Sequence, residues 1–249
     1  LTKFWLRRGT LKKNIAKTPN EGVNLFDYII RPKDSVELDL SSEEEYNHDL
    51  ITCNPILLLD KDELMNRRDA CARLGVPENA VIVYVQLGAG NINDINSEIG
   101  MTIDALKRYE DIYVVLGESM IGARLNVSGE RIRIIRDYPN SRFFRAFDFS
   151  IMAAGYNSFH EAVQFSLPTI FYPNMNTGQD DQLKRAKVAE DVGAMLIVRK
   201  RTESNIADAI EKLYDEDLRK VMKKKAALLH TENGAEQIAK YLIDMINES

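Results

Sequence analysis

The chain has 249 residues, of which 45% are hydrophobic and 29% are charged, a composition typical of a globular protein. Its formal net charge of −5 argues against bulk nucleic-acid binding, which usually needs a basic face. Cys53 and Cys71 are too few for a disulfide framework, no Cys/His cluster has zinc spacing, and no apolar run reaches the roughly 20 residues that span a bilayer. We therefore expect a cytoplasmic protein with one large domain, or one domain and an extension.

The first eighty residues do not show a regular alternation of strands and helices. A strand is expected over residues 26–30 and a helix over residues 62–74. Residues 1–13 mix aromatic and basic side chains, a composition that suits either contact with a membrane surface or packing of the aromatic rings on the domain. We assign residues 1–50 to the tail of an N-terminal domain or an extension, and residues 51–80 to a connecting segment and helix.

From residue 81 onward, short apolar strands alternate with helical segments. The six expected strands are residues 81–87, 112–116, 132–135, 149–153, 169–172 and 194–198. Helices are expected over residues 95–109, 182–192, 204–214, 217–229 and 235–246. The alternation predicts an α/β domain over residues 81–249, with a doubly wound, Rossmann-like parallel sheet. Ligands of such sheets bind beyond the carboxyl ends of the strands.

A glycine turn and a polar helix start follow the fourth of these strands. Gly155 begins the turn, and Asn157 and Ser158 stand in the expected first turn of the helix. A helix start of this kind offers free backbone N–H groups and the positive end of a helix dipole, where a phosphate binds readily. Glu161, about one turn further, could accept hydrogen bonds from ribose hydroxyls. The segment indicates a nucleoside-diphosphate site, although the same residues could serve only to cap the helix.

The same segment resembles a known signature. Glycosyltransferases with the GT-B fold bind their sugar donor through such a turn, and the plant members carry Gly-Trp-Asn-Ser-x-x-Glu. Gly155, Asn157, Ser158 and Glu161 fit that spacing. The resemblance implies that Asn157 and Ser158 contact the donor diphosphate and that Glu161 contacts the ribose.

Two segments nearer the N-terminus extend the resemblance. Residues 52–56, Thr-Cys-Asn-Pro-Ile, resemble the Thr-Gly-Asn-Pro-Val segment that connects the two domains of MurG-type transferases. The turn formed by Gly88, Ala89 and Gly90 stands where the family has the glycine-rich first turn of its C-terminal domain. Glycines there let backbone N–H groups approach the substrates closely, although a tight strand-to-helix connection would require glycine as well.

Two further segments correspond to the parts of the family site that bind the base and the sugar. Ile135, Arg136 and Tyr138 stand where this fold places the nucleobase, and Tyr138 could stack on uracil or be a core tyrosine. Asp181 and Gln182 resemble the pair that holds the sugar hydroxyls, since a carboxylate and an amide can accept from and donate to neighbouring hydroxyls. The alternative is that they form the N-cap and first turn of a helix.

The sequence departs from the family pattern near the phosphates. Tyr156 replaces the tryptophan of the signature, while Ala153 and Leu57 replace a phosphate-binding His and an Arg. The missing positive charge could come from one of three other cations: Arg136, Lys184 or Arg185.

The resemblance implies the C-terminal, donor-binding domain of a GT-B glycosyltransferase that moves a hexose or N-acetylhexosamine from a UDP-sugar to an unknown acceptor. It implies no metal and no cofactor besides the nucleotide sugar. The catalytic residues remain unknown, because an acceptor-binding N-terminal domain or a partner chain is expected to supply them. One alternative is a UDP-N-acetylglucosamine 2-epimerase, which shares the architecture and has Glu-Glu-Ala where this chain has His-Glu-Ala at residues 160–162. The other is a non-catalytic donor-binding subunit that needs a partner chain.

Overall fold

The computed structural model describes residues 2–8, 25–36, 49–88, 95–119, 124–177 and 180–247, and these form two compact units. Unit 1 comprises residues 1–57, 177–181 and 231–249, and unit 2 comprises residues 58–176 and 182–230. This division differs from the expected three parts, residues 1–50, 51–80 and 81–249, the last of which included the last helix. The last helix joins unit 1 because Gly234 N–H donates to the Pro55 carbonyl at 2.9 Å, and Asn54 N–H donates to Gln237 Oε1 at 2.9 Å.

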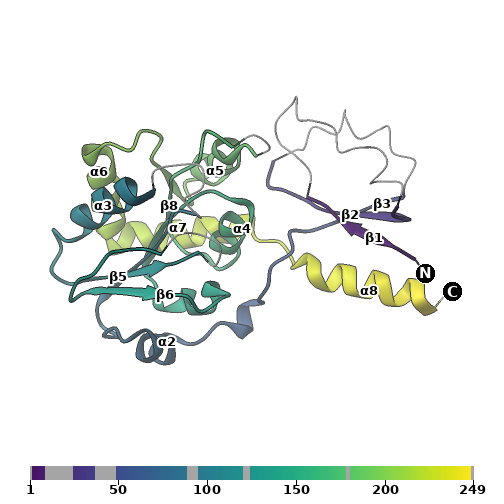
Figure 1. Cartoon of the computed structure of the whole chain (residues 1–249), viewed down its shortest axis with the longest axis horizontal. Helices are drawn as coiled ribbons and strands as arrows, with labels where there is room; N and C mark the ends of the chain where they lie inside the picture. The colour runs from purple at the N-terminus through teal and green to yellow at the C-terminus, as the bar shows by residue number, and fades with distance from the viewer. Residues whose placement is uncertain are drawn as a thin grey trace. The chain divides into compact units, whose positions relative to one another are not determined.

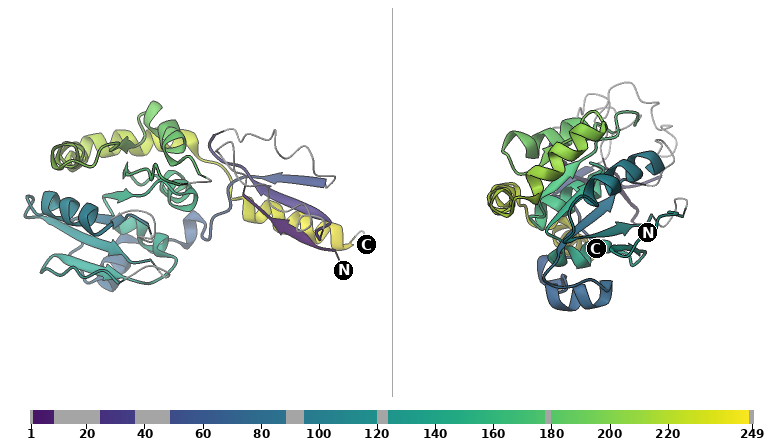
Figure 2. Two further views of the ribbon diagram at one scale, coloured as in Figure 1. Left: turned by 45° about the horizontal axis from the view of Figure 1, so that its top comes forward. Right: turned by 90° about the vertical axis from the view of Figure 1, so that its left-hand side faces the viewer.

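Unit 1 contains a three-stranded parallel sheet in the order β1-β2-β3. The strands are β1 (Phe4–Leu6), β2 (Tyr28–Pro32) and β3 (Asp49–Cys53). The helix α8 (Gly234–Asn247) lies along these strands (Figure 2). Only one of the three strands was expected from the sequence, and it was placed two residues too early. The strands are short, and their pairing partners are distant in the chain, so local patterns indicate them poorly.

Unit 2 contains a six-stranded parallel sheet in the order β6-β5-β4-β7-β8-β9. All six strands predicted for the doubly wound sheet are present, with the last one shorter than expected. They are β4 (Val81–Gln86), β5 (Ile112–Gly117), β6 (Ile132–Ile135), β7 (Phe149–Met152), β8 (Thr169–Phe171) and β9 (Leu196–Ile197).

The helices of unit 2 follow the predicted pattern, with one correction. They are α2 (Arg67–Leu74), α3 (Ile95–Leu106), α4 (Tyr156–Gln164), α5 (Gln182–Asp191), α6 (Glu203–Tyr214) and α7 (Glu216–Ala226), with the 3₁₀ turns η1 (Lys61–Glu63), η2 (Asn140–Ala146) and η3 (Ala227–Leu229). The helix expected over residues 62–74 is broken into η1 and α2. The Asn66 side chain accepts the N–H of Asp69 at 2.9 Å and so caps α2, which starts five residues later than expected.

Two hydrophobic clusters cover the two faces of this sheet. Along β4, Ile82 and Tyr84 belong to the cluster with α2, α4 and α5, whereas Val83 and Val85 belong to the cluster with α3 and α6. This alternation follows from the two-residue period of a strand. Figure 1 shows α3 and α6 side by side on their face of the sheet. Both faces are buried, as is usual for a parallel sheet.

The topology of unit 2 fixes where a ligand is expected. From β4 the chain continues to β5 and β6 on one side, and then it crosses to β7, β8 and β9 on the other side. The pair β4–β7 is therefore the switch point of the sheet, and ligands of doubly wound folds bind at the carboxyl ends of the strands at this point.

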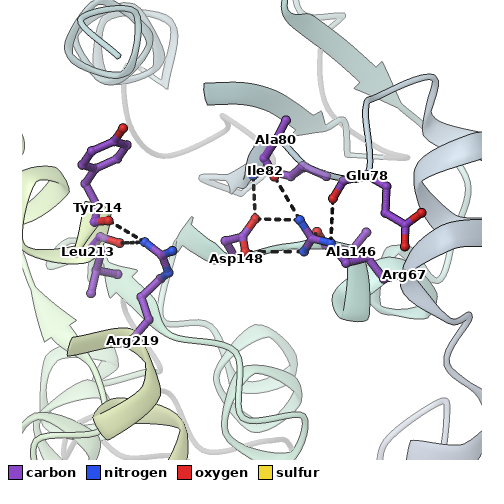
Figure 3. A network of polar contacts seen from close by, with 9 residues as sticks. All are labelled: Arg67, Glu78, Ala80, Ile82, Ala146, Asp148, Leu213, Tyr214 and Arg219. Atoms are coloured by element: carbon purple, nitrogen blue, oxygen red, sulfur yellow. Dashed lines mark hydrogen bonds and ion pairs between the residues drawn. The ribbon is translucent and has the colours of Figure 1, made fainter. Parts of the chain in front are cut away.

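The opposite edge of the sheet is held by a charged network that the sequence analysis did not predict. Arg67 donates to both carboxylate oxygens of Asp148 at 3.4 and 3.2 Å, and its remaining N–H groups bond three backbone carbonyls (Figure 3). Asp148 in turn accepts the N–H of Ile82 at 2.8 Å. The network ties α2 to the amino ends of β4 and β7, far along the strands from the switch-point turns.

Replacing Arg67 by alanine is expected to lower the free energy of unfolding by about 2–3 kcal/mol, because the partly buried carboxylate of Asp148 would lose its partner. Urea denaturation measures this loss. Arg68→Ala, which removes an exposed arginine from the same helical turn, is the control and should change stability by less than about 0.5 kcal/mol. Equal losses in the two variants would mean that the network adds nothing beyond the surface charge.

Candidate functional site

The turn between β7 and α4 lies at the switch point. Gly155 is the N-cap of α4, with φ −61° and ψ 157°, a conformation that any residue adopts. A methyl group added at this glycine would meet none of the described residues within 4 Å. Neither the backbone nor the packing of the described residues requires glycine here.

The second glycine turn lies next to the first. Gln86 of β4 pairs with Met152 of β7, and the N–H of Ala153 donates to the Gln86 carbonyl at 3.1 Å. Gly88 follows two residues after Gln86 and has φ +100°, a conformation that L-residues rarely adopt. Unlike Gly155, this glycine is required by its backbone. Its predicted companions Ala89 and Gly90 lie outside the described residues.

The first turn of α4 is open for binding. Asn157 is exposed and Ser158 is half-buried, and neither residue has a side-chain hydrogen bond within the part of the chain that the structure describes. The N–H groups of a first helical turn have no acceptor within the helix. Side-chain and backbone donors therefore gather at the carboxyl ends of β4 and β7, together with the positive end of the α4 dipole.

Glu161 lies one turn further along α4 and is tied to the segment before β7. Its Oε1 accepts a hydrogen bond from Ser141 Oγ at 2.8 Å, and Ser141 is 2% exposed. Burial raises the pKa of the Glu161 carboxyl to about 7, and the bond from Ser141 opposes that rise. Near neutral pH this carboxyl therefore exists in both protonation states. Pairing with Ser141 could not be predicted from the sequence, because the two residues are twenty positions apart on different elements.

The residues predicted to bind the nucleobase differ in their exposure and in the contacts that they already make within the protein. The side chain of Tyr138 is 58% exposed, which rules out a core tyrosine. Burial of its phenol and the Glu161 carboxylate both raise the pKa of Tyr138, which places the two side chains in one neighbourhood. The Ile135 carbonyl already accepts the N–H of Glu118 at 2.9 Å. Arg136 faces that same segment, with its Nε 3.3 Å from Glu118 Oε2.

Glu118 is a residue of this edge that the sequence analysis missed. It is 7% exposed and follows β5 directly, at the carboxyl edge of the sheet. It accepts the N–H of Leu125 at 2.8 Å and pairs with Arg124 at 2.6 Å, and these contacts hold the pKa of its carboxyl below the usual value. An acidic residue immediately after a buried strand was the signal that could have found it.

The predicted sugar ligands stand at the start of α5. Because α5 begins at Gln182, Asp181 occupies the N-cap position. Gln182 is 8% exposed, and its Oε1 accepts the N–H of Asn174 at 2.9 Å. Because this bond occupies Oε1, the amide NH₂ is the group of Gln182 that can donate hydrogen bonds to a ligand. Asp181 is grouped with unit 1, whereas Gln182 belongs to unit 2.

Of the three candidate cations, one lies directly behind the Gly155 turn. Arg185 of α5 is fully buried and donates to the Ala154 carbonyl at 2.9 Å. Its guanidinium carbon lies 5.7 Å from the centre of the Tyr156 ring. Tyr156, which replaces the tryptophan of the family signature, is itself 7% exposed and packs inward. Lys184, by contrast, is exposed.

No group of three or more His, Cys, Asp or Glu side chains among the described residues could hold a metal ion. None of the described helices is long and apolar enough to cross a membrane.

Comparison with known proteins now places this fold. Residues 138–242 match the family described as glycosyltransferase family 28 C-terminal domain. Among solved structures, MurG of Acinetobacter baumannii is similar at a TM-score of 0.57 and 14% identity, over 98% of this chain and 66% of that one. The calicheamicin glycosyltransferase CalG4 is similar at 0.58 and 12%, over 89% and 53%. The spinosyn rhamnosyltransferase SpnG, complexed with thymidine diphosphate, is similar at 0.55 and 11%, over 84% and 66%. No curated protein sequence matches.

The fold is thus that of GT-B glycosyltransferases, with the doubly wound sheet of unit 2 as their Rossmann-like C-terminal domain. The match to the glycosyltransferase family 28 C-terminal domain covers residues 138–242, which is less than half of the chain. The chain spans between about half and two thirds of the length of the solved structures compared above.

Proposed function

We propose that this chain is the donor-binding part of a glycosyltransferase that transfers a hexose or N-acetylhexosamine from UDP-sugar to an acceptor hydroxyl. The diphosphate binds at the start of α4, with Asn157 and Ser158, and the ribose hydroxyls bind to Glu161. Uracil lies against Tyr138, and the sugar hydroxyls face Asp181 and Gln182. The family match over residues 138–242 supports the donor role, and SpnG with its thymidine diphosphate supports a nucleoside diphosphate as the ligand class.

The proposed reaction moves one glycosyl group. The bond between the anomeric carbon and the diphosphate oxygen breaks, and the leaving diphosphate keeps the electron pair. The acceptor oxygen forms the new bond to the anomeric carbon, and its proton passes to a base that remains unknown. Negative charge grows on the diphosphate during this step. Backbone N–H groups of the first turn of α4 and its dipole are placed to stabilise that charge.

The observation that carries the proposal is the open space at Gly155. Gly155 has an ordinary backbone conformation, and no described residue lies near the position of a Cβ, so nothing in the described part of the chain requires glycine there. A ligand that approaches the backbone closely would require it, because any side chain would separate the N–H groups from a phosphate. The carboxyl of Glu161, about one helical turn beyond Ser158, adds a hydrogen-bond acceptor to the same site.

Calorimetric titration of the chain with UDP, UMP and uridine tests this proposal. UDP is expected to bind at least about tenfold more tightly than uridine, since charge-assisted hydrogen bonds to the phosphates are worth about 1.5–3 kcal/mol each. TDP in place of UDP reports on the base. Equal affinities for UDP and uridine, or no binding of UDP at all, would contradict a diphosphate site.

The variant Ser158→Ala tests the contribution of one side-chain donor to UDP binding. Loss of one hydroxyl donor is expected to weaken UDP binding by roughly threefold to tenfold and to leave uridine binding unchanged. Ser204→Ala is the matched control, because Ser204 is an exposed serine in the first turn of α6, away from the switch point. An equal loss of UDP affinity in the control would remove Ser158 from the site.

A further inference from the structure

One charged side chain beside the proposed diphosphate site has no role in the function described so far. Arg185 is the largest side chain in the fully buried part of the core, and it comes from α5 rather than from the turn that it touches. Its Nη1 donates to the Ala154 carbonyl at 2.9 Å, and its guanidinium lies against the ring of Tyr156. Both contacts are with residues that flank Gly155.

The bond to the Ala154 carbonyl has a geometric consequence for the next residue. In a planar trans peptide, the carbonyl of one residue and the N–H of the following residue point in opposite directions. Because Arg185 is fully buried, the Ala154 carbonyl that it binds points into the protein. The N–H of Gly155 therefore points outward, away from the core.

Two observations at Gly155 agree with an outward N–H. This N–H has no hydrogen-bond acceptor among the residues that the structure describes. No described residue comes within 4 Å of the place where a Cβ would stand on Gly155. The donor thus lies on the side from which a ligand would reach the first turn of α4.

We propose that Arg185 is a positioning residue for the donor diphosphate, which holds the Ala154 carbonyl inside the protein and so directs the Gly155 N–H at a phosphate oxygen. The proposal rests on the proposed function, since it assumes a diphosphate at the start of α4. Tyr156 supports the arrangement, since its ring centre lies 5.7 Å from the guanidinium carbon. Arg185 acts through the backbone, without touching the ligand.

Replacing Arg185 by methionine tests the proposal, with UDP and uridine titrations followed by NMR and with thermal unfolding as a check on folding. The variant is expected to weaken UDP binding about tenfold or more, as for the loss of an oriented donor to a charged group, and to leave uridine binding unchanged. Arg185→Lys, which retains a donor for the Ala154 carbonyl, should recover most of the UDP affinity. Lys187→Met, which removes an exposed positive charge from the same helix, should change neither affinity.

A second measurement needs no variant of Arg185. With ¹⁵N-glycine labelling, the Gly155 amide proton should shift downfield when UDP is added and should stay in place with uridine, whereas the amide of Gly100 within α3 should not respond to either. The signal of Gly155 is assigned by its loss in Gly155→Ala.

The outcomes separate this inference from the proposed function. A wild-type chain that does not bind UDP contradicts both. UDP binding that leaves the Gly155 amide unmoved, or that survives Arg185→Met unchanged, overturns the role of Arg185 and leaves the diphosphate site standing. Equal losses of UDP and uridine binding in folded Arg185→Met would also overturn it, because a purely structural role predicts that result.

Discussion

Glu161→Gln is expected to make the unliganded protein more stable at pH 8 and to make it a weaker nucleotide binder. Burial raises the pKa of Glu161 to about 7 in the folded chain, whereas an unfolded glutamate has a pKa near 4.5. Between these two pH values the folded state binds more protons than the unfolded state, so stability falls as the pH rises. Below about pH 4.5 the carboxyl is neutral in both states and costs nothing.

The neutral amide in Glu161→Gln removes the free-energy cost of ionising a buried carboxyl. At pH 8 the variant should gain up to about 3 kcal/mol of unfolding free energy, and at pH 4 the gain should vanish. Urea denaturation at several pH values measures the difference. Glu211→Gln is the control for the loss of one surface carboxylate, because Glu211 is exposed on α6. If the variant were less stable than the wild type at pH 8, ionisation of Glu161 would not lower the stability of the folded protein, and the prediction would be wrong.

Nucleotide binding should change in the opposite direction. An ionised carboxylate can accept hydrogen bonds from two ribose hydroxyls, whereas an amide oxygen replaces only one of its two acceptors. We expect a loss of about 1–3 kcal/mol in UDP affinity at pH 8, which is roughly tenfold to hundredfold. Wild-type affinity should rise as the pH passes 7, and the variant should lack that part of the rise. A site that costs stability and serves binding is typical of functional residues.

Gly155→Ala is expected to leave the fold intact and to weaken UDP binding strongly. The glycine has φ −61°, and an added methyl group would meet no described neighbour within 4 Å. Alanine lowers the entropy of the unfolded chain but is a poorer N-cap than glycine, and these opposing effects should leave the net stability change within about 1 kcal/mol. The methyl group would, however, occupy the space through which a phosphate reaches the first turn of α4.

The expected loss of UDP affinity is at least about tenfold for alanine and larger for valine, by analogy with the close backbone approach that glycines allow in other phosphate-binding turns. Calorimetry with UDP and uridine measures it, and uridine binding should change much less. Gly100→Ala is the matched control, since Gly100 also has no described neighbour near a Cβ position but lies within α3. That variant should be stabilised by about 0.5–1 kcal/mol, with UDP binding unchanged. Wild-type UDP affinity in Gly155→Ala would contradict a phosphate at this turn.

The sequence by itself determined the sheet domain and the position of its most informative turn. Apolar runs of four to seven residues between helical segments identified all six strands of unit 2, because burial on both faces selects apolar side chains locally. The sequence also revealed the signature formed by Gly155, Asn157, Ser158 and Glu161, because its residues are close together in the chain. A helix start and the residue one turn later are neighbours in the chain as well as in space.

Only the tertiary structure decided the hydrogen-bond partners, the burial and the pKa values of these residues. Three contacts join residues that are distant in the chain. Ser141 and Glu161 are 20 positions apart, and Arg185 and Ala154 are 31 positions apart. Arg67 and Asp148, at the other edge of the sheet, are 81 positions apart. The pKa of Glu161 and the open space at Gly155 arise from what surrounds them, which no local pattern encodes. The grouping of α8 with the N-terminal strands likewise depends on hydrogen bonds between segments more than 170 residues apart. Periodicity reports whether a side chain is buried, whereas its partners are set by how distant segments pack.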